Sequence, residues 1–181
     1  WNCATLRRPT RLHELCDCLG QERFDLWAVQ GTRWSGEAKM FKIVADGTEY
    51  RVYSDGYAEG EDWKDDYAGV AVVFREAWLR PGWRVTMKVL SKGRLMGVRV
   101  RGAGSADMYI LCYYGVPAGS RGGVEHRRRV LRALEEAIQA APRRARLYVL
   151  GDFNAKIGRV PGRGARGREG PADGSVGDEG Q

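Results

Sequence analysis

The sequence predicts an α/β layered sandwich, and three observations support this prediction. Extended segments with buried or alternating apolar side chains recur from residue 24 to residue 150, and they outnumber the helical segments. Two segments, one early and one late, repeat their apolar residues at helical spacing. The 181 residues, 43% of them hydrophobic, suffice for one domain with its own core. Many strands with few helices are typical of sheets whose outer faces are covered by helices.

The first half of the chain predicts one helix and four strands. The helix is predicted over Arg8–Gly20, where apolar residues recur at i, i+3, i+4 and i+7 and Gly20 suits the C-terminal stop. Asp46-Gly47 predicts the turn of a hairpin, and Ser54–Tyr67, with six acidic residues, predicts a polar loop. The strands are predicted over Phe24–Gln30, Lys39–Val44, Glu49–Tyr53 and Gly69–Phe74.

The second half predicts four further strands and the longest helix. Val124–Ala141 carries an apolar stripe at helical spacing, and Pro142 ends it. A turn is predicted over Gly102–Ser105. The strands are predicted over Trp83–Leu90, Arg94–Arg101, Asp107–Tyr114 and Arg146–Leu150.

The positive charge is concentrated late in the chain. The net charge is +7, and residues 120–170 hold 13 basic and 5 acidic side chains. Arginine binds phosphate through its planar fork, so this segment is a candidate polyanion-binding surface. A solvated helix face explains the same charges, and both interpretations stay open.

Composition also excludes some classes of protein. No apolar run approaches the roughly 18 residues that a membrane-spanning helix needs, so we expect no membrane partner. Four cysteines are too few for a disulfide scaffold, which favours an intracellular protein.

One motif contains the candidate catalytic residues. Residues 147–154 read LYVLGDFN, so a buried strand ends in an Asp and an Asn, with a glycine that permits a sharp turn. Asp152 can accept a proton from water, and the Asn154 amide can donate to a phosphate oxygen. A structural interpretation also stands, in which Asp152 caps a turn and Asn154 adopts a left-handed backbone.

Four motifs occur in order along the chain, and together they carry a resemblance. They are Trp1-Asn2, VQGTRW at 29–34, YGVP at 114–117 and GDFNAKIG at 151–158. In this order the chain resembles the endonuclease/exonuclease/phosphatase superfamily, the DNase I-like fold. Within it, the chain is most similar to endonuclease domains of non-LTR retrotransposons and their craniofacial-development-protein-2-like relatives. The resemblance implies a four-layer α/β sandwich that hydrolyses phosphodiesters with Mg²⁺ or Mn²⁺.

The resemblance assigns roles by position. Asn2 helps to hold the metal and its water, and Asp152 positions or deprotonates the attacking water. Asn154 binds the scissile phosphate, and Tyr114 is the active-site tyrosine, with Tyr113 as the alternative.

The implied partner is DNA, bound by a monomer in the nucleus. Candidate DNA contacts are Arg33, Trp34, Arg127 and Arg128, although Trp34 equally suits core or rim packing.

The chain departs from the family pattern in two places. The metal-binding Glu of the family's Q-E-T motif is Gly31 here, which has no ligand atom. Glu37 and Asp25 are nearby carboxylates, but neither matches that position. The family also has a late Asp-His pair, whereas the histidines here are His13 and His126, which we interpret as surface or interface residues.

We therefore expect an incomplete domain over residues 1–160, truncated at both ends, followed by a Gly/Arg-rich loop or frayed end over residues 161–181. Three hypotheses follow. The first is a metal-dependent DNA phosphodiesterase domain whose activity is impaired. The second is a non-catalytic remnant that binds nucleic acid through residues 120–170. The third, a lipid or inositol phosphate phosphodiesterase, is disfavoured by the QxTRW and GDFNAKIG motifs.

Overall fold

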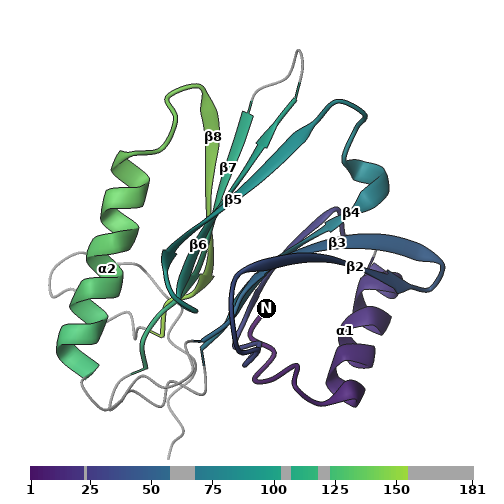
Figure 1. Ribbon diagram of the computed structural model, residues 1–181, viewed down its shortest axis with the longest axis horizontal. Helices are drawn as coiled ribbons and strands as arrows, with labels where there is room; N and C mark the ends of the chain where they lie inside the picture. The colour runs from purple at the N-terminus through teal and green to yellow at the C-terminus, as the bar shows by residue number, and fades with distance from the viewer. Residues whose placement is uncertain (23, 58–67, 103–106, 118–122, 155–181) are drawn as a thin grey trace, which may run out of the picture.

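The computed structural model describes residues 1–22, 24–57, 68–102, 107–117 and 123–154. In these residues two β-sheets face each other, and each carries one long helix on its outer side (Figure 1). Helix, sheet, sheet and helix make the predicted four-layer α/β sandwich.

The first half of the chain forms one sheet and its helix. Its elements are α1 (Pro9–Glu22), β1 (Leu26–Gln30), β2 (Lys39–Ala45), β3 (Thr48–Asp55) and β4 (Val70–Arg75). The strand order is β1-β4-β3-β2, and every pair is antiparallel.

Three predicted boundaries in this half were wrong by two residues, and one of them is the start of β1, which lies at Leu26 and not at Phe24. Helix α1 passes Gly20, the predicted stop, because that glycine serves close packing: an added Cβ would lie 3.0 Å from the Asp46 Cβ. Strand β3 continues to Asp55, where we expected a loop from Ser54 onwards. The buried Asp55 carboxylate holds the strand end in place by accepting hydrogen bonds from the Gly93 N–H at 2.6 Å and the Lys92 Nζ at 3.0 Å.

The second half forms the other sheet. Its elements are η1 (Glu76–Trp78), β5 (Arg84–Ser91), β6 (Leu95–Arg101), β7 (Asp107–Tyr114), α2 (Gly123–Gln139) and β8 (Ala145–Asp152). The strand order is β5-β6-β7-β8, and β7 and β8 pair in parallel, connected through α2. A parallel pair needs a long crossover connection, which α2 provides. Strand β8 ends at Asp152, two residues later than predicted.

Three apolar clusters fill the spaces between the four layers. Leu15 and Leu19 of α1 pack against Val52 and Val73 of the first sheet. The second cluster lies between the two sheets, and its buried members include Val72, Phe74, Met96, Val98, Ile110 and Cys112. The third cluster joins Val130, Leu134 and Ala137 of α2 to Leu95, Leu111 and Tyr113 of the second sheet. Burial of these side chains is the main source of stability for the layered arrangement.

Some predictions fall on residues that the structure does not describe. These are most of the Gly102–Ser105 turn, the acidic part of the loop over residues 58–67, and the segment 155–181 with its Gly/Arg-rich tract. Neither described helix is long and apolar enough to cross a membrane.

Candidate active site

The candidate site lies between the two sheets, at the end of the sandwich where β1, β7 and β8 finish. The parallel register of β7 and β8 places Tyr114 directly beside Asp152, and neighbouring strands lie about 4.8 Å apart. From the first sheet, β1 leads into Gly31, and a parallel bridge aligns Asn2 with Gln30. Residues about 150 positions apart in the chain thus meet at one end of the molecule.

The Asp152 carboxylate is the centre of a hydrogen-bond network. The Asn2 Nδ2 donates to its Oδ2 at 2.8 Å, and the backbone N–H of Asn154 donates to its Oδ1 at 2.9 Å. The second bond closes a turn in which Asn154 has a left-handed φ of 46°. The turn-capping interpretation of Asp152 and Asn154 is therefore confirmed, and it coexists with their place in the candidate site.

The Gly115 backbone connects this turn to the end of β7. Its N–H donates to the Asp152 carbonyl at 2.7 Å, and its carbonyl accepts from the Asn154 Nδ2 at 2.8 Å. A side chain at position 115 would not fit, because an added Cβ would lie 2.3 Å from the Phe153 carbonyl oxygen. The segments carrying Tyr114 and Asn154 are therefore fixed against each other.

The role predicted for Gly151 was wrong. We expected it to permit a sharp turn, but it lies within β8 and has no positive φ. A Cβ there would lie 1.9 Å from the Tyr113 carbonyl oxygen, so glycine is required for the approach of β7 to β8. The left-handed turn is at Asn154 instead.

The two adjacent tyrosines face opposite sides of the second sheet. Tyr114 belongs to the cluster between the sheets and lies close to position 31, whereas Tyr113 belongs to the cluster under α2 and packs on Phe153 with ring centroids 5.0 Å apart. The structure therefore places Tyr114 in the candidate site and removes the alternative, Tyr113, to the other face.

Gly31 occupies the site but contributes no side chain. An ideal Cβ at this position would lie 3.0 Å from the Asn2 Oδ1 and 3.6 Å from the Tyr114 hydroxyl. Its φ is 73°, a left-handed value that any other residue would adopt only under strain. The position that the family resemblance gives to the metal carboxylate thus lies beside Asn2 and Tyr114, with a backbone conformation that favours glycine.

The described residues do not fit a divalent cation. Magnesium prefers carboxylate oxygens in octahedral arrangement. Here the one carboxylate, Asp152, has both oxygens hydrogen-bonded, and the Asn2 Oδ1 accepts from the Ala4 N–H at 3.0 Å. No group of three or more His, Cys, Asp or Glu side chains within the described ranges could hold a metal.

Two nearby thiols do not change this conclusion. Cys3 and Cys112 lie beside Gln30, since the Cys3 Sγ donates to its carbonyl at 3.2 Å and its Nε2 donates to the Cys112 Sγ at 3.5 Å. Burial raises the pKa of each thiol to about 11, so both are protonated at neutral pH. A protonated thiol is a poor metal ligand.

The alternative carboxylates lie elsewhere. Asp25 precedes β1, at the opposite end of that strand from Gly31, and pairs with Arg75. The Glu37 side chain is 99% exposed, and its carboxylate lies 3.8 Å from the Lys92 Nζ. Neither contributes a carboxylate at position 31.

The four candidate DNA contacts have different surroundings. Arg33 lies two residues after Gly31, beyond the same strand end, and has a left-handed φ of 54°. Trp34 is half-buried and packs edge-on against Phe41, with ring centroids 5.5 Å apart, which favours its rim-packing interpretation. The Arg127 Nε donates to the Val116 carbonyl at 3.4 Å, near the end of β7.

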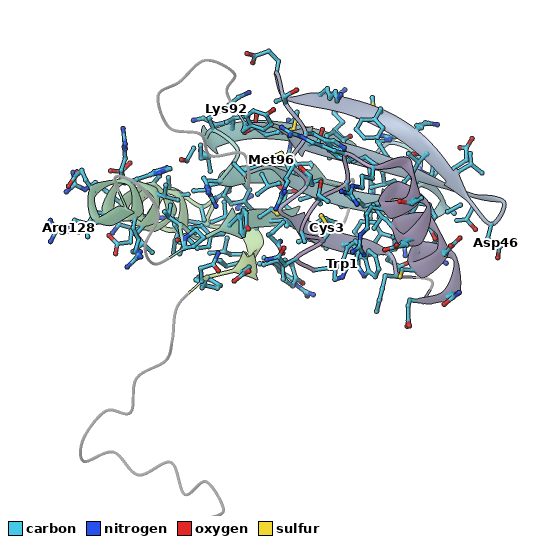
Figure 2. All side chains as sticks on the ribbon, turned by 90° about the horizontal axis from the view of Figure 1, so that it is seen from below. Trp1, Cys3, Asp46, Lys92, Met96 and Arg128 are labelled. Atoms are coloured by element: carbon cyan, nitrogen blue, oxygen red, sulfur yellow. The ribbon has the colours of Figure 1, made fainter. Side chains whose placement is uncertain are left out.

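Arg128 is exposed on the outward side of α2, far from the β2–β3 hairpin tip at Asp46 (Figure 2). Its guanidinium is therefore accessible to a phosphate.

Arg94 was missed from the sequence. It is buried, its Nη1 donates to the Gly115 carbonyl at 3.2 Å, and its Cζ lies 4.6 Å from the Tyr114 ring centroid. An arginine at the start of an alternating strand gave no signal, because this chain has many surface arginines.

Comparison with known proteins identifies a family and a shared fold. The model of the Endonuclease/Exonuclease/phosphatase family matches residues 1–175. No curated protein matches the chain. A crystal structure of D. rerio TDP2, humanised by 14 mutations, superposes with a TM-score of 0.51 at 17% sequence identity. The match covers 86% of this chain and 61% of that chain, and at this identity it shows the fold alone.

Proposed function

The chain belongs to the endonuclease/exonuclease/phosphatase family, and we propose that it is a retrotransposon-type DNA endonuclease domain whose phosphodiester hydrolysis is impaired. The observation that carries the proposal is that Asn2 and Tyr114 both lie beside position 31, where glycine supplies no side chain, while Asp152 is hydrogen-bonded to Asn2 and lies next to Tyr114 in the sheet. The arrangement suits a phosphodiester, but one component of the family site is missing from it.

The remaining side chains can perform three tasks. The Asp152 carboxylate can accept the proton of an attacking water. Asn154 uses one amide hydrogen for the Gly115 carbonyl and has a second for a phosphate oxygen. The Tyr114 hydroxyl, at the adjacent strand end, can donate to the same phosphate. These groups can bind and orient the scissile phosphate.

Impairment follows from the charge that is missing at position 31. Hydrolysis builds negative charge on the phosphate oxygens, which enzymes of this family offset with a divalent metal. The ligand set of the described residues fits such an ion poorly, so Mg²⁺ or Mn²⁺ should bind weakly. Losing a principal ligand of a metal site is costly to activity.

We further propose that the partner is duplex DNA, bound by a monomer in the nucleus. Arg127 lies against the end of β7, and Arg128 is exposed on the same first part of α2. Phosphate contacts of this kind make affinity fall steeply as salt rises.

The test is nicking of supercoiled plasmid in Mg²⁺, Mn²⁺ or EDTA, together with filter binding of duplex DNA at several salt concentrations. We expect salt-sensitive binding and no metal-dependent nicking above background. Metal-dependent nicking that Asp152→Ala abolishes would contradict the impairment. The absence of both nicking and salt-sensitive binding would contradict the DNA assignment.

A second candidate function is a non-catalytic remnant that binds nucleic acid through its basic segment. It is favoured by a set of exposed arginines on α2 and in its connection to β8. They are Arg128, Arg129, Arg132, Arg143 and Arg144. Gly31→Glu separates the two candidates: renewed nicking in Mn²⁺ supports the impaired endonuclease, and unchanged binding without nicking supports the remnant.

A further inference from the structure

The largest fully buried side chain in the described part of the molecule is a charged one. Arg94 has 1% of its surface exposed. It lies just before β6, at the end of the second sheet that carries the candidate site. Burying a guanidinium is costly unless its surroundings compensate for the lost hydration, so a buried arginine calls for a specific explanation.

Hydrogen bonds fix both the backbone N–H and the backbone carbonyl of Arg94. Its N–H donates to the Ser91 carbonyl at 2.9 Å, and its carbonyl accepts from the Tyr114 N–H at 2.7 Å. The second bond connects the start of β6 to the last residue of β7. The side chain therefore starts from a rigid position directly beside the site tyrosine.

The guanidinium contacts the end of β7 twice. The Arg94 Cζ lies 4.6 Å from the centroid of the Tyr114 ring, a cation–π arrangement that restrains the plane of the ring. The Arg94 Nη1 donates to the Gly115 carbonyl at 3.2 Å. Both the aromatic ring and the carbonyl that follows it are thus held by one side chain.

The Gly115 carbonyl also binds the side chain of Asn154, whose Nδ2 donates to it at 2.8 Å. A carbonyl oxygen has two lone pairs. Arg94 and Asn154 therefore donate to the same carbonyl oxygen, which couples the position of one side chain to that of the other.

From these contacts we infer that Arg94 is a positioning residue, which orients the Tyr114 ring and, through the shared Gly115 carbonyl, the Asn154 amide that meets the phosphate. The inference rests on the proposed function where phosphate is concerned. The geometry itself is testable without DNA. A purely structural role for Arg94 would lower stability and leave Asn154 in place in the folded protein.

The chain offers a direct spectroscopic probe, because Asn2 and Asn154 are its two asparagines. Selective ¹⁵N labelling of asparagine therefore gives two side-chain amide signals, both from the site. Arg94→Lys keeps the positive charge and loses the planar fork. Arg94→Gln keeps a donor and loses the charge. Arg99→Lys is the matched control, because Arg99 is half-buried further along β6 and pairs with Asp107.

We expect the Asn154 amide signal to move in Arg94→Lys and Arg94→Gln, while the Asn2 signal keeps its position. Arg99→Lys should leave both signals unchanged. Duplex DNA affinity should fall about fivefold in Arg94→Lys, as for the loss of one well-placed hydrogen bond.

Two results would overturn the inference. One is an Asn154 signal that stays in place in folded variants of reduced stability. The other is an equal movement of both asparagines, which would indicate a general loosening of the site. If wild-type protein does not bind DNA, the proposed function fails, while the movement of the Asn154 signal still decides the role of Arg94. If Arg94→Lys does not fold, Arg94→Gln is judged by the same criteria.

Discussion

The two strand ends that meet in the candidate site differ in what they contribute. The end of β8 presents Asp152 and Asn154, with three hydrogen bonds that fix their side chains. The end of β1 presents Gly31, which contributes backbone alone. The β8 end thus contributes a charged side chain, Asp152, whereas Gly31 at the β1 end contributes no side chain.

This difference shows that the surroundings of a position and the side chain at that position are separate features of a site. Gly31 still has the Asn2 amide and the Tyr114 hydroxyl on the side where a Cβ would point. A side chain at position 31 would therefore lie among polar groups. The end of β8, in contrast, retains the groups that can orient water and phosphate.

The largest expected effect is on stability at the β8 end. Gly151→Ala places a Cβ 1.9 Å from the Tyr113 carbonyl oxygen, so β7 and β8 must separate. Such overpacking should cost about 3 kcal/mol in the free energy of unfolding, measured by urea denaturation. Gly82→Ala is the control, because it has a φ of 83° and open space around it. Equal losses in both variants would contradict the packing role of Gly151.

The same substitution at the β1 end should cost less. Gly31→Ala forces alanine into a left-handed conformation and brings a Cβ to 3.0 Å from the Asn2 Oδ1. The strain should lower the free energy of unfolding by about 2 kcal/mol. A stability equal to wild type would show that the backbone here accepts any residue, and that the missing glutamate is a simple substitution.

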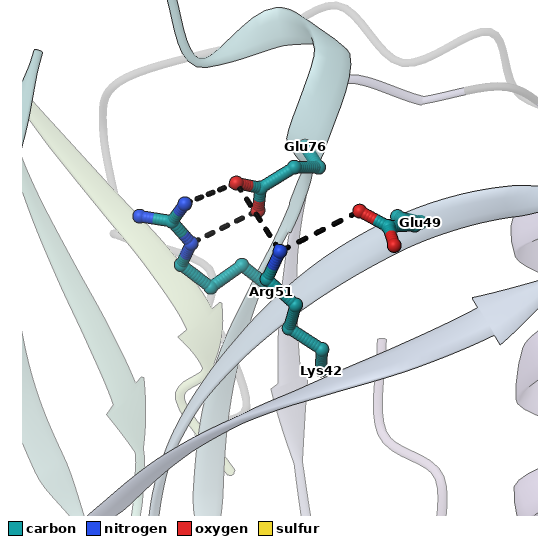
Figure 3. Close-up of polar contacts among 4 residues, drawn as sticks. All are labelled: Lys42, Glu49, Arg51 and Glu76. Atoms are coloured by element: carbon teal, nitrogen blue, oxygen red, sulfur yellow. Dashed lines mark hydrogen bonds and ion pairs between the residues drawn. The ribbon is translucent and has the colours of Figure 1, made fainter. Parts of the chain in front are cut away.

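A third prediction concerns the opposite end of the sandwich, where a substitution should change stability without changing the candidate site. Arg51 donates to both carboxylate oxygens of Glu76, and Lys42 lies 3.7 Å from the same carboxylate and 3.5 Å from that of Glu49 (Figure 3). The hydrogen bonds from Arg51 hold the pKa of Glu76 below its usual value.

Because the pKa of Glu76 is lowered in the folded protein, the stabilisation that its ion pair with Arg51 provides depends on pH. The stabilisation is fully present above the pKa that Glu76 has in the unfolded chain. It is lost as the pH falls through the lower pKa that Glu76 has in the folded protein. Glu76→Gln should therefore cost about 1 kcal/mol at neutral pH and less near pH 3, which lies below the usual pKa of a glutamate in an unfolded chain. Denaturation at both pH values measures the difference. A cost independent of pH would contradict it, and DNA binding should stay unchanged.

The smallest expected effect tests the charge difference between the two ends directly. Asp152→Asn removes a negative charge beside the proposed phosphate position, and Gly31→Glu adds one at the other strand end. In EDTA we expect DNA affinity to rise about threefold in the first and to fall about threefold in the second, because charges near a phosphate act through screened Coulomb forces. Filter binding at low salt measures both. Changes of the same sign would contradict the arrangement.

The secondary structure was largely predictable from local patterns. All eight strands and both helices occur where alternation or helical spacing predicted them, with shifts of a few residues at their ends. The shifts at Gly20 and Gly151 have one cause. Each glycine is explained by a close approach between segments distant in sequence, and local rules had assigned it to a helix stop or a turn.

The residues of the candidate site could be predicted from the sequence, but the buried residue that holds them in place could not. Motif resemblance selected Asn2, Tyr114, Asp152 and Asn154, and the structure brings all four together, while their roles stay predictions. Arg94 was not predictable, because its importance comes from burial and from a carbonyl it shares with a residue 60 positions away.

The sequence by itself determined the elements, the layers and the absence of a carboxylate at position 31. These depend on the periodicity of side chains and on the identity of one residue. The tertiary structure alone decided that Tyr114 faces the site while Tyr113 faces α2. It also decided that Gly31 has a left-handed backbone. Sheet register and long-range packing fix these features, and neither is encoded within a few residues of sequence.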